Sequence, residues 1–151
     1  RAFYQKKLID EYKCPLVSFT VVMPGPVKQN EMSEKIFTKG KAEIEKALCE
    51  YNVVFKDERA NVTGYEAYYS VNTSVSVLKK LMTEIEDGSE IGRLYDIDVI
   101  GFDYQPVSRS EFGMRDRKGL ICGGPAHACS RSRKHSVKEL LEKIERVLSD
   151  E

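Results

Sequence analysis

The sequence lacks a long apolar run and a net charge, and these absences exclude several classes of protein. No stretch of about 18 apolar residues occurs, so we expect neither a membrane-spanning helix nor a membrane partner. The 24 basic side chains equal the 24 acidic ones in number, and such a balance does not select nucleic acid as a partner. With 151 residues, 41% of them hydrophobic, the chain has the size and composition of one folded domain, residues 1–151.

Cysteine is scarce, and three well-known glycine motifs are absent. Four scattered cysteines are too few for a small disulfide scaffold, and no signal peptide is visible, so we expect a cytoplasmic protein. No Gly-x-x-x-x-Gly-Lys-Ser/Thr and no Gly-x-Gly-x-x-Gly occurs, which disfavours P-loop and Rossmann enzymes. The Gly-x-Ser-x-Gly elbow of many hydrolases is missing too.

The apolar periodicity predicts an α+β protein. After a short leading helix the order is strand, helix, strand, strand, helix, strand, which is typical of the split βαβ (ferredoxin-like) arrangement. We therefore expect a four-stranded, mostly antiparallel sheet with two helices on one face and its other face exposed, followed by a basic C-terminal region and a terminal helix; the alternative is a compact nucleotidyltransferase core. The strands are expected at 16–23, 51–57, 64–72 and 94–102, and the helices at 3–12 and 32–50, from Thr73 or Ser74 to Asp87-Gly88, and after Ser136, with a turn at Glu58-Arg59-Ala60-Asn61.

Two aspartates interrupt the last predicted strand, LYDIDVIGF (94–102). Aspartate is uncommon in strands, and Asp96 and Asp98 fall on one face, about 6.6 Å apart along the chain. Two carboxylates at this spacing can share a hard cation such as Mg²⁺, whose remaining ligands are often substrate phosphates. The alternative is an exposed strand face on which both carboxylates meet water.

Charge is unevenly distributed around this strand. Residues 84–103 hold seven acids against Arg93 alone, whereas residues 109–138 hold eight bases against Glu111 and Asp116. The two segments are predicted either to form the two halves of a metal and phosphate site or simply to neutralise each other.

The basic segment also contains soft metal ligands, spaced Cys-x4-His-x-Cys-x5-His. This spacing is not that of a standard zinc finger, so a zinc site competes with a buried free cysteine and a surface histidine. A third interpretation gives the last histidine a role in proton transfer, and the neighbouring basic side chains can hold phosphates. The residues are Cys122, His127, Cys129 and His135, with Arg131, Arg133 and Lys134.

Several stretches together resemble a known family, the apo-citrate lyase phosphoribosyl-dephospho-CoA transferases, also called citrate lyase holo-acyl-carrier-protein synthases. The resemblance covers essentially the whole chain, with departures at Val22-Met23 and Ser130. It is carried by LVSFTVVMPGPVK (16–28), GRLYDIDVIG (92–101), Val107-Ser108-Arg109, Phe112-Gly113, CGGPAHACSRSRKHS (122–136) and the closing EL-x-x-KI.

The resemblance implies a bacterial cytoplasmic enzyme of the nucleotidyltransferase class. Its donor would be 2′-(5″-triphosphoribosyl)-3′-dephospho-CoA, its acceptor a serine of the citrate lyase acyl carrier protein, and its by-product pyrophosphate. Asp96 and Asp98 would bind Mg²⁺, and His135 or, less favoured, Asp103 would accept the serine proton. The triphosphate would be clamped by Arg93, Arg109, Arg131 and Arg133.

Two other classes compete with this enzyme. A non-enzymatic RNA-binding module would stack bases on exposed sheet aromatics such as Tyr68, although no matching aromatic RNA-binding motif occurs. A zinc-stabilised assembly subunit would dock the carrier protein without catalysing transfer.

Overall fold

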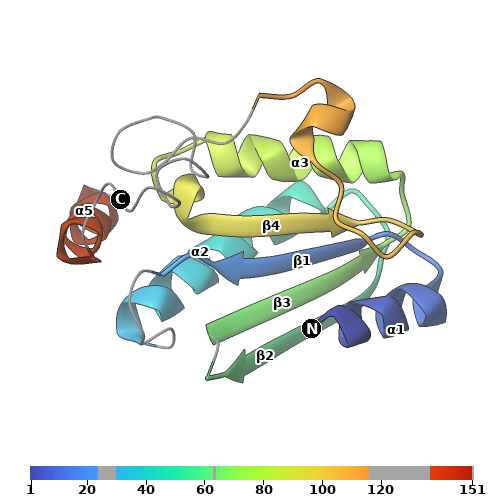
Figure 1. The fold of residues 1–151 in the computed structure, drawn as a ribbon, viewed down its shortest axis with the longest axis horizontal. Helices are drawn as coiled ribbons and strands as arrows, with labels where there is room; N and C mark the ends of the chain where they lie inside the picture. Colours follow the sequence, from blue (N-terminus) through green and yellow to red (C-terminus); the bar gives the residue numbers. More distant parts are fainter. Residues whose placement is uncertain (24–29, 63, 116–136, 151) are drawn as a thin grey trace.

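Four antiparallel strands form the central sheet of the computed structural model, in the order β2-β3-β1-β4 (Figure 1). The structure describes residues 1–23, 30–62, 64–115 and 137–150. The prediction of an α+β protein with a four-stranded antiparallel sheet is confirmed. The elements are α1 (Ala2–Tyr12), β1 (Leu16–Val21), α2 (Glu31–Ala47), β2 (Val53–Asn61), β3 (Gly64–Val71), α3 (Val75–Asp87), the 3-10 helix η1 (Ile91–Leu94), β4 (Tyr95–Ile100), the 3-10 helix η2 (Arg109–Phe112) and α5 (Val137–Asp150).

Local sequence signals explain where two of the helices begin. Asn30 caps α2 by accepting a hydrogen bond from Ser33 N at 2.8 Å, and the Ser33 hydroxyl completes the capping box. Ser74 caps α3 by accepting from Val77 N at 3.2 Å, as one of the two predicted caps. Within α2, a Cβ at Gly40 would lie 2.3 Å from the Phe19 ring. The glycine therefore lets α2 approach β1 closely.

The predicted turn at Glu58-Arg59-Ala60-Asn61 is wrong, because β2 continues to Asn61, which pairs with Gly64. Contacts with residues distant in sequence hold the charged residues of this stretch in the strand. Lys41 pairs with Glu58, and the Arg59 guanidinium lies 3.5 Å from the centre of the Tyr4 ring. A charge-bearing outer edge strand is typical, since such side chains discourage pairing with another chain.

The main core lies on the face of the sheet covered by α2 and α3, with α5 packing at one end (Figure 1). The inward side chains alternate along β3 and β4 as the sequence predicts. On β3 they are Tyr65, Ala67, Tyr69 and Val71, and on β4 they are Tyr95, Ile97 and Val99. The predicted sidedness of β3 and β4 is therefore confirmed.

The opposite face of the sheet is not exposed, which corrects the prediction. Helix α1 lies on that face (Figure 1), where Leu8 and Ile9 pack with Leu16 and Tyr68. Tyr68 is fully buried and makes an edge contact with Tyr4, with ring centres 5.0 Å apart. The physical reason is the apolar stripe of the leading helix, which needs a partner surface. Tyr68 consequently offers no exposed platform for stacking bases.

None of the described helices combines the length and the apolar character that a membrane crossing requires.

Candidate active site

Asp96 and Asp98 lie side by side on the α1 face of the sheet, as their spacing predicts. Asp98 pairs in register with Ser18, and Asp96 with Thr20. Both aspartates are half-buried, whereas their neighbours along β4 are buried in the core. Strand β4 is an edge strand, so the pair lies at a border of the sheet.

The environment of Asp98 disfavours a free negative charge. Burial raises the pKa of Asp98 to about 6, with repulsion from Asp96 as the next cause and Glu86 adding to it. Lys79 and Arg1 act in the opposite direction but do not cancel these effects. Within the part of the chain that the structure describes, no hydrogen bond reaches the Asp98 carboxylate. A cation bound between the two aspartates would offset this repulsion.

The donor chemistry fits a hard divalent cation. Mg²⁺ in proteins is commonly bound through one or two carboxylates plus substrate phosphates, and a pair of same-face aspartates supplies that number. Among the described residues no group of three or more His, Cys, Asp and Glu side chains is placed to hold a metal. A cage made entirely of such protein ligands is therefore not found in the described ranges.

A row of polar side chains continues from the aspartates across the same face. Thr20 of β1 pairs with Asp96 on one side and with Glu66 of β3 on the other. Glu66 is 7% exposed, accepts a hydrogen bond from the Tyr68 hydroxyl at 2.6 Å, and faces Arg1 Nε at 3.8 Å. The beginning of α1 thus contributes to the surroundings of the site.

Sequence reasoning missed two charged residues of this region, Glu66 and Lys79. Glu66 carries the same signal as the aspartates, because it is a lone acid in the otherwise apolar segment GYEAYYSV. Lys79, on α3, is only 6% exposed. Its signal is the spacing of Lys79, Thr83 and Glu86 on one side of an amphipathic helix.

Arg109, predicted to bind phosphate, lies in a buried network of charges. Its guanidinium donates two hydrogen bonds of 3.0 Å each to Asp87 and one of 2.8 Å to Glu86. The second Glu86 oxygen accepts from Ile97 N at 3.1 Å. Through these contacts the basic segment partly neutralises the acidic one, which is one of the two alternatives that the charge distribution predicts. Phosphate binding by Arg109 stays a prediction, and its described side-chain hydrogen bonds are to the two carboxylates and to the Arg115 carbonyl oxygen, at 3.3 Å.

The other predicted site residues divide into two groups. Arg93 is half-buried in η1, directly before β4, and Asp103 is exposed and accepts from Gln105 N at 3.1 Å in a turn beyond β4. The second group lies outside the described residues, so its zinc, phosphate and proton-transfer roles stay predictions: Cys122, His127, Cys129, Arg131, Arg133 and His135.

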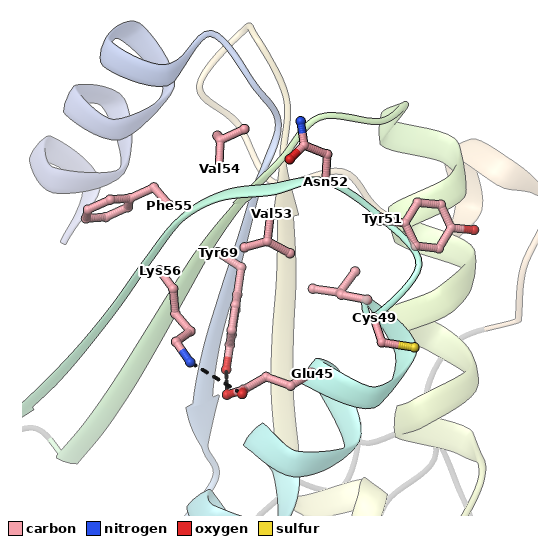
Figure 2. A pocket seen from close by; sticks show the side chains of 10 residues that line it. Glu45, Cys49, Tyr51, Asn52, Val53, Val54, Phe55, Lys56 and Tyr69 are labelled. Atoms are coloured by element: carbon pink, nitrogen blue, oxygen red, sulfur yellow. Dashed lines mark hydrogen bonds and ion pairs between the residues drawn. The ribbon is translucent and has the colours of Figure 1, made fainter.

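A groove of about 560 Å³ lies at the opposite border of the sheet, between β2 and the end of α2 (Figure 2). Its walls include Val53, Val54 and Phe55 of β2, and Tyr69 and Lys56 both contact Glu45 there, at 2.9 and 3.4 Å. Two strands separate β2 from β4. This groove is therefore distinct from the carboxylate pair.

Comparison with known proteins gives these residues a context. The family model for the apo-citrate lyase phosphoribosyl-dephospho-CoA transferases matches residues 1–151. The chain belongs to this family. The resemblance seen in the sequence is thereby confirmed, and the family is one of transferase enzymes.

Curated relatives agree with this membership. A probable apo-citrate lyase phosphoribosyl-dephospho-CoA transferase of Vibrio cholerae serotype O1 is 39% identical over 154 residues, covering 99% of this chain and 86% of the relative. The Shigella boydii transferase of the same name is 32% identical over 144 residues, covering 94% and 79%. A Haemophilus influenzae protein, named Protein CitXG, is 33% identical over 147 residues. This chain spans only 32% of that last relative.

Proposed function

We propose that this protein transfers a phosphoribosyl-dephospho-CoA group to apo-citrate lyase. Its membership of the transferase family supports the reaction, and the same reaction stands in the names of the Vibrio and Shigella relatives. The observation that carries the proposal within the chain is the pair Asp96 and Asp98, half-buried on one face of an edge strand with cationic side chains nearby.

The donor in this proposal is 2′-(5″-triphosphoribosyl)-3′-dephospho-CoA, and the acceptor is a serine of the citrate lyase acyl carrier protein. The serine oxygen attacks the α-phosphorus and forms the new phosphodiester bond. The bond from that phosphorus to the bridging oxygen breaks, and pyrophosphate leaves with the electron pair. The serine proton passes to a base, for which His135 and Asp103 are the candidates.

Asp96 and Asp98 are proposed to hold magnesium against the donor. When bound, the ion would neutralise charge on the phosphate oxygens as the leaving group departs. The chain's own part is to present two carboxylates on one face of a strand, which would hold the ion where the phosphates bind. Arg93, Arg131 and Arg133 are proposed to bind the triphosphate.

The strand order supports the finer description of the fold as a split βαβ, ferredoxin-like sheet. Each crossover helix joins two strands that are separated by one other strand, since α2 leads from β1 to β2 around β3, and α3 leads from β3 to β4 around β1. In such a sheet both crossover helices lie on one face, and the proposed site lies on the other face. The RNA-binding alternative loses its support, because Tyr68 is buried.

The test uses purified citrate lyase acyl carrier subunit and the triphosphate donor, with transfer followed by the mass increase of the carrier. Wild-type protein with Mg²⁺ is expected to modify the carrier, and Asp96→Asn and Asp98→Asn are expected to lose at least about 100-fold in rate, the order of a charge-stabilising interaction in a transition state. Glu84→Gln, an exposed acid of α3, is the matched control. Near-normal transfer by both asparagine variants would refute the metal role.

A further inference from the structure

We propose that Lys79, on the helix that runs along the outer edge of β4, is a phosphate-binding residue that acts together with the aspartate pair. This inference rests on the proposed function, and it adds to the site a residue from α3. Its basis is the position of α3, the burial of Lys79 and the lack of a partner for its ammonium group.

Helix α3 runs antiparallel to β4 along the edge of the sheet. Near the end of the helix, Glu86 accepts a hydrogen bond from Ile97 N at 3.1 Å. At its beginning, the side chain of Val75 lies 3.6 Å from the position that a Cβ on Gly101 would occupy. Lys79 falls between these two fixed points, about 10 Å from Glu86 along the helix axis. It therefore lies beside the part of β4 that carries Asp98.

The ammonium group of Lys79 has no partner among the described residues. The side chain is 6% exposed, yet among the described residues it makes no hydrogen bond and no ion pair. Thr83, one turn along the same stripe, also has a buried hydroxyl without a hydrogen-bond partner in the described part of the chain. Glu86, the acid of this stripe, already accepts hydrogen bonds from Ile97 N and from the Arg109 guanidinium. The stem of Lys79 is thus packed against the protein, whereas its ammonium group is not among the fully buried atoms and can meet a ligand.

A bound anion would supply the missing partner. The positive charge of Lys79 lies near enough to Asp98 to lower the pKa of that carboxyl group. The two groups nevertheless form no ion pair. A phosphate oxygen that meets a cation held by the aspartates can meet the Lys79 ammonium on its other side. In the proposed reaction the phosphates that need such support are those of the leaving pyrophosphate.

Binding of inorganic pyrophosphate with Mg²⁺, measured by isothermal titration calorimetry, tests this role without the transfer reaction. Lys79→Met keeps the length of the side chain and removes the charge. Lys80→Met removes the same charge from an exposed neighbour on α3 and is the matched control for long-range electrostatics. We expect Lys79→Met to weaken binding about 10- to 100-fold, the value of one charge-assisted hydrogen bond, and Lys80→Met to change it less than about twofold.

Thermal unfolding separates this role from a structural one. If Lys79 serves a ligand, Lys79→Met is expected to unfold at the wild-type temperature or above it, because methionine keeps the packing of the stem and the ammonium group that is lost has no protein partner among the described residues. A lysine that stabilises the fold would give a lower unfolding temperature instead. Unchanged pyrophosphate binding in a folded Lys79→Met protein, equal weakening by Lys80→Met, or a wild-type protein that does not bind pyrophosphate would each overturn the inference.

The transfer assay distinguishes failure of this inference from failure of the proposed function. Pyrophosphate binding that depends on Lys79, in a protein that modifies no carrier, would leave the phosphate site standing and refute the transferase activity. Normal transfer by Lys79→Met would leave the activity standing and refute the role of the lysine.

Discussion

Replacement of Arg109 by methionine tests whether this arginine belongs to the fold or to the substrate. The change removes the guanidinium that holds Glu86 and Asp87. Glu86 is 4% exposed and would lose the buried cation that faces it at 2.8 Å, although its hydrogen bond from Ile97 N would remain. Asp87, whose side chain is 55% exposed, would be solvated by water. The effect on stability therefore comes mainly from Glu86.

The magnitude follows from the burial of the pair. Removing one partner of a buried ion pair destabilises a protein by about 3–5 kcal/mol. For a chain of this length each kcal/mol corresponds to about 2–4 °C, so the melting temperature should fall by roughly 6–20 °C. Urea unfolding followed by circular dichroism at pH 7 gives the free energy directly.

Two further variants make the measurement decisive. Lys35→Met breaks the exposed pair with Glu31, at 3.8 Å, and should change the free energy of unfolding by at most about 0.5 kcal/mol. The double variant Arg109→Met, Glu86→Gln should regain part of the lost stability, since no buried charge is left unpaired while an acceptor for Ile97 N remains. A free energy of unfolding for Arg109→Met within about 1 kcal/mol of the wild-type value would refute the structural role of Arg109. Loss of transfer without loss of stability would instead favour the predicted phosphate role.

Two other stability measurements test the site and the core. Because the pKa of Asp98 is raised to about 6 in the folded protein, the folded state holds that proton more tightly than the unfolded state, so Asp98 lowers stability progressively as the pH rises from about 4 to about 6. Asp98→Asn should therefore be more stable than wild type at pH 7, by up to about 3 kcal/mol, and this gain should disappear near pH 4. If the variant and the wild type have the same free energy of unfolding at pH 7 as well as at pH 4, the buried environment inferred for Asp98 is contradicted. Gly40→Ala should destabilise by about 1–3 kcal/mol, although alanine favours helices, because the new Cβ would lie 2.3 Å from the fully buried Phe19 ring; a more stable variant in urea unfolding would show that this ring can move.

The sidedness of β4 is predictable from sequence because it depends only on local geometry. Side chains alternate between the faces of any strand, so Tyr95, Ile97 and Val99 must oppose Asp96 and Asp98 once the segment is a strand. The caps of α3 are equally local. Ser74 and Gly88 act at the ends of the helix they flank.

The errors arise where contacts join distant parts of the chain. The apolar stripe of α1 is visible in the sequence, but the surface that it covers is not, so the buried state of Tyr68 was not predictable from the pattern alone. The continuation of β2 through Glu58 and Arg59 likewise depends on Lys41 and Tyr4. The polar stripe of Lys79, Thr83 and Glu86 is visible in the sequence, but only the packing of α3 along β4 shows that Lys79 lies near Asp98.

The contact between Glu86 and Ile97 also determines how this sheet can grow. An edge strand normally offers free N–H groups to any incoming chain, but the carboxylate of Glu86 occupies the one on Ile97. Helix α3 thus closes the β4 border, and a strand donated by another protein would have to add alongside β2. Addition of a strand is in this way confined to the border of the sheet opposite the one that carries Asp96 and Asp98.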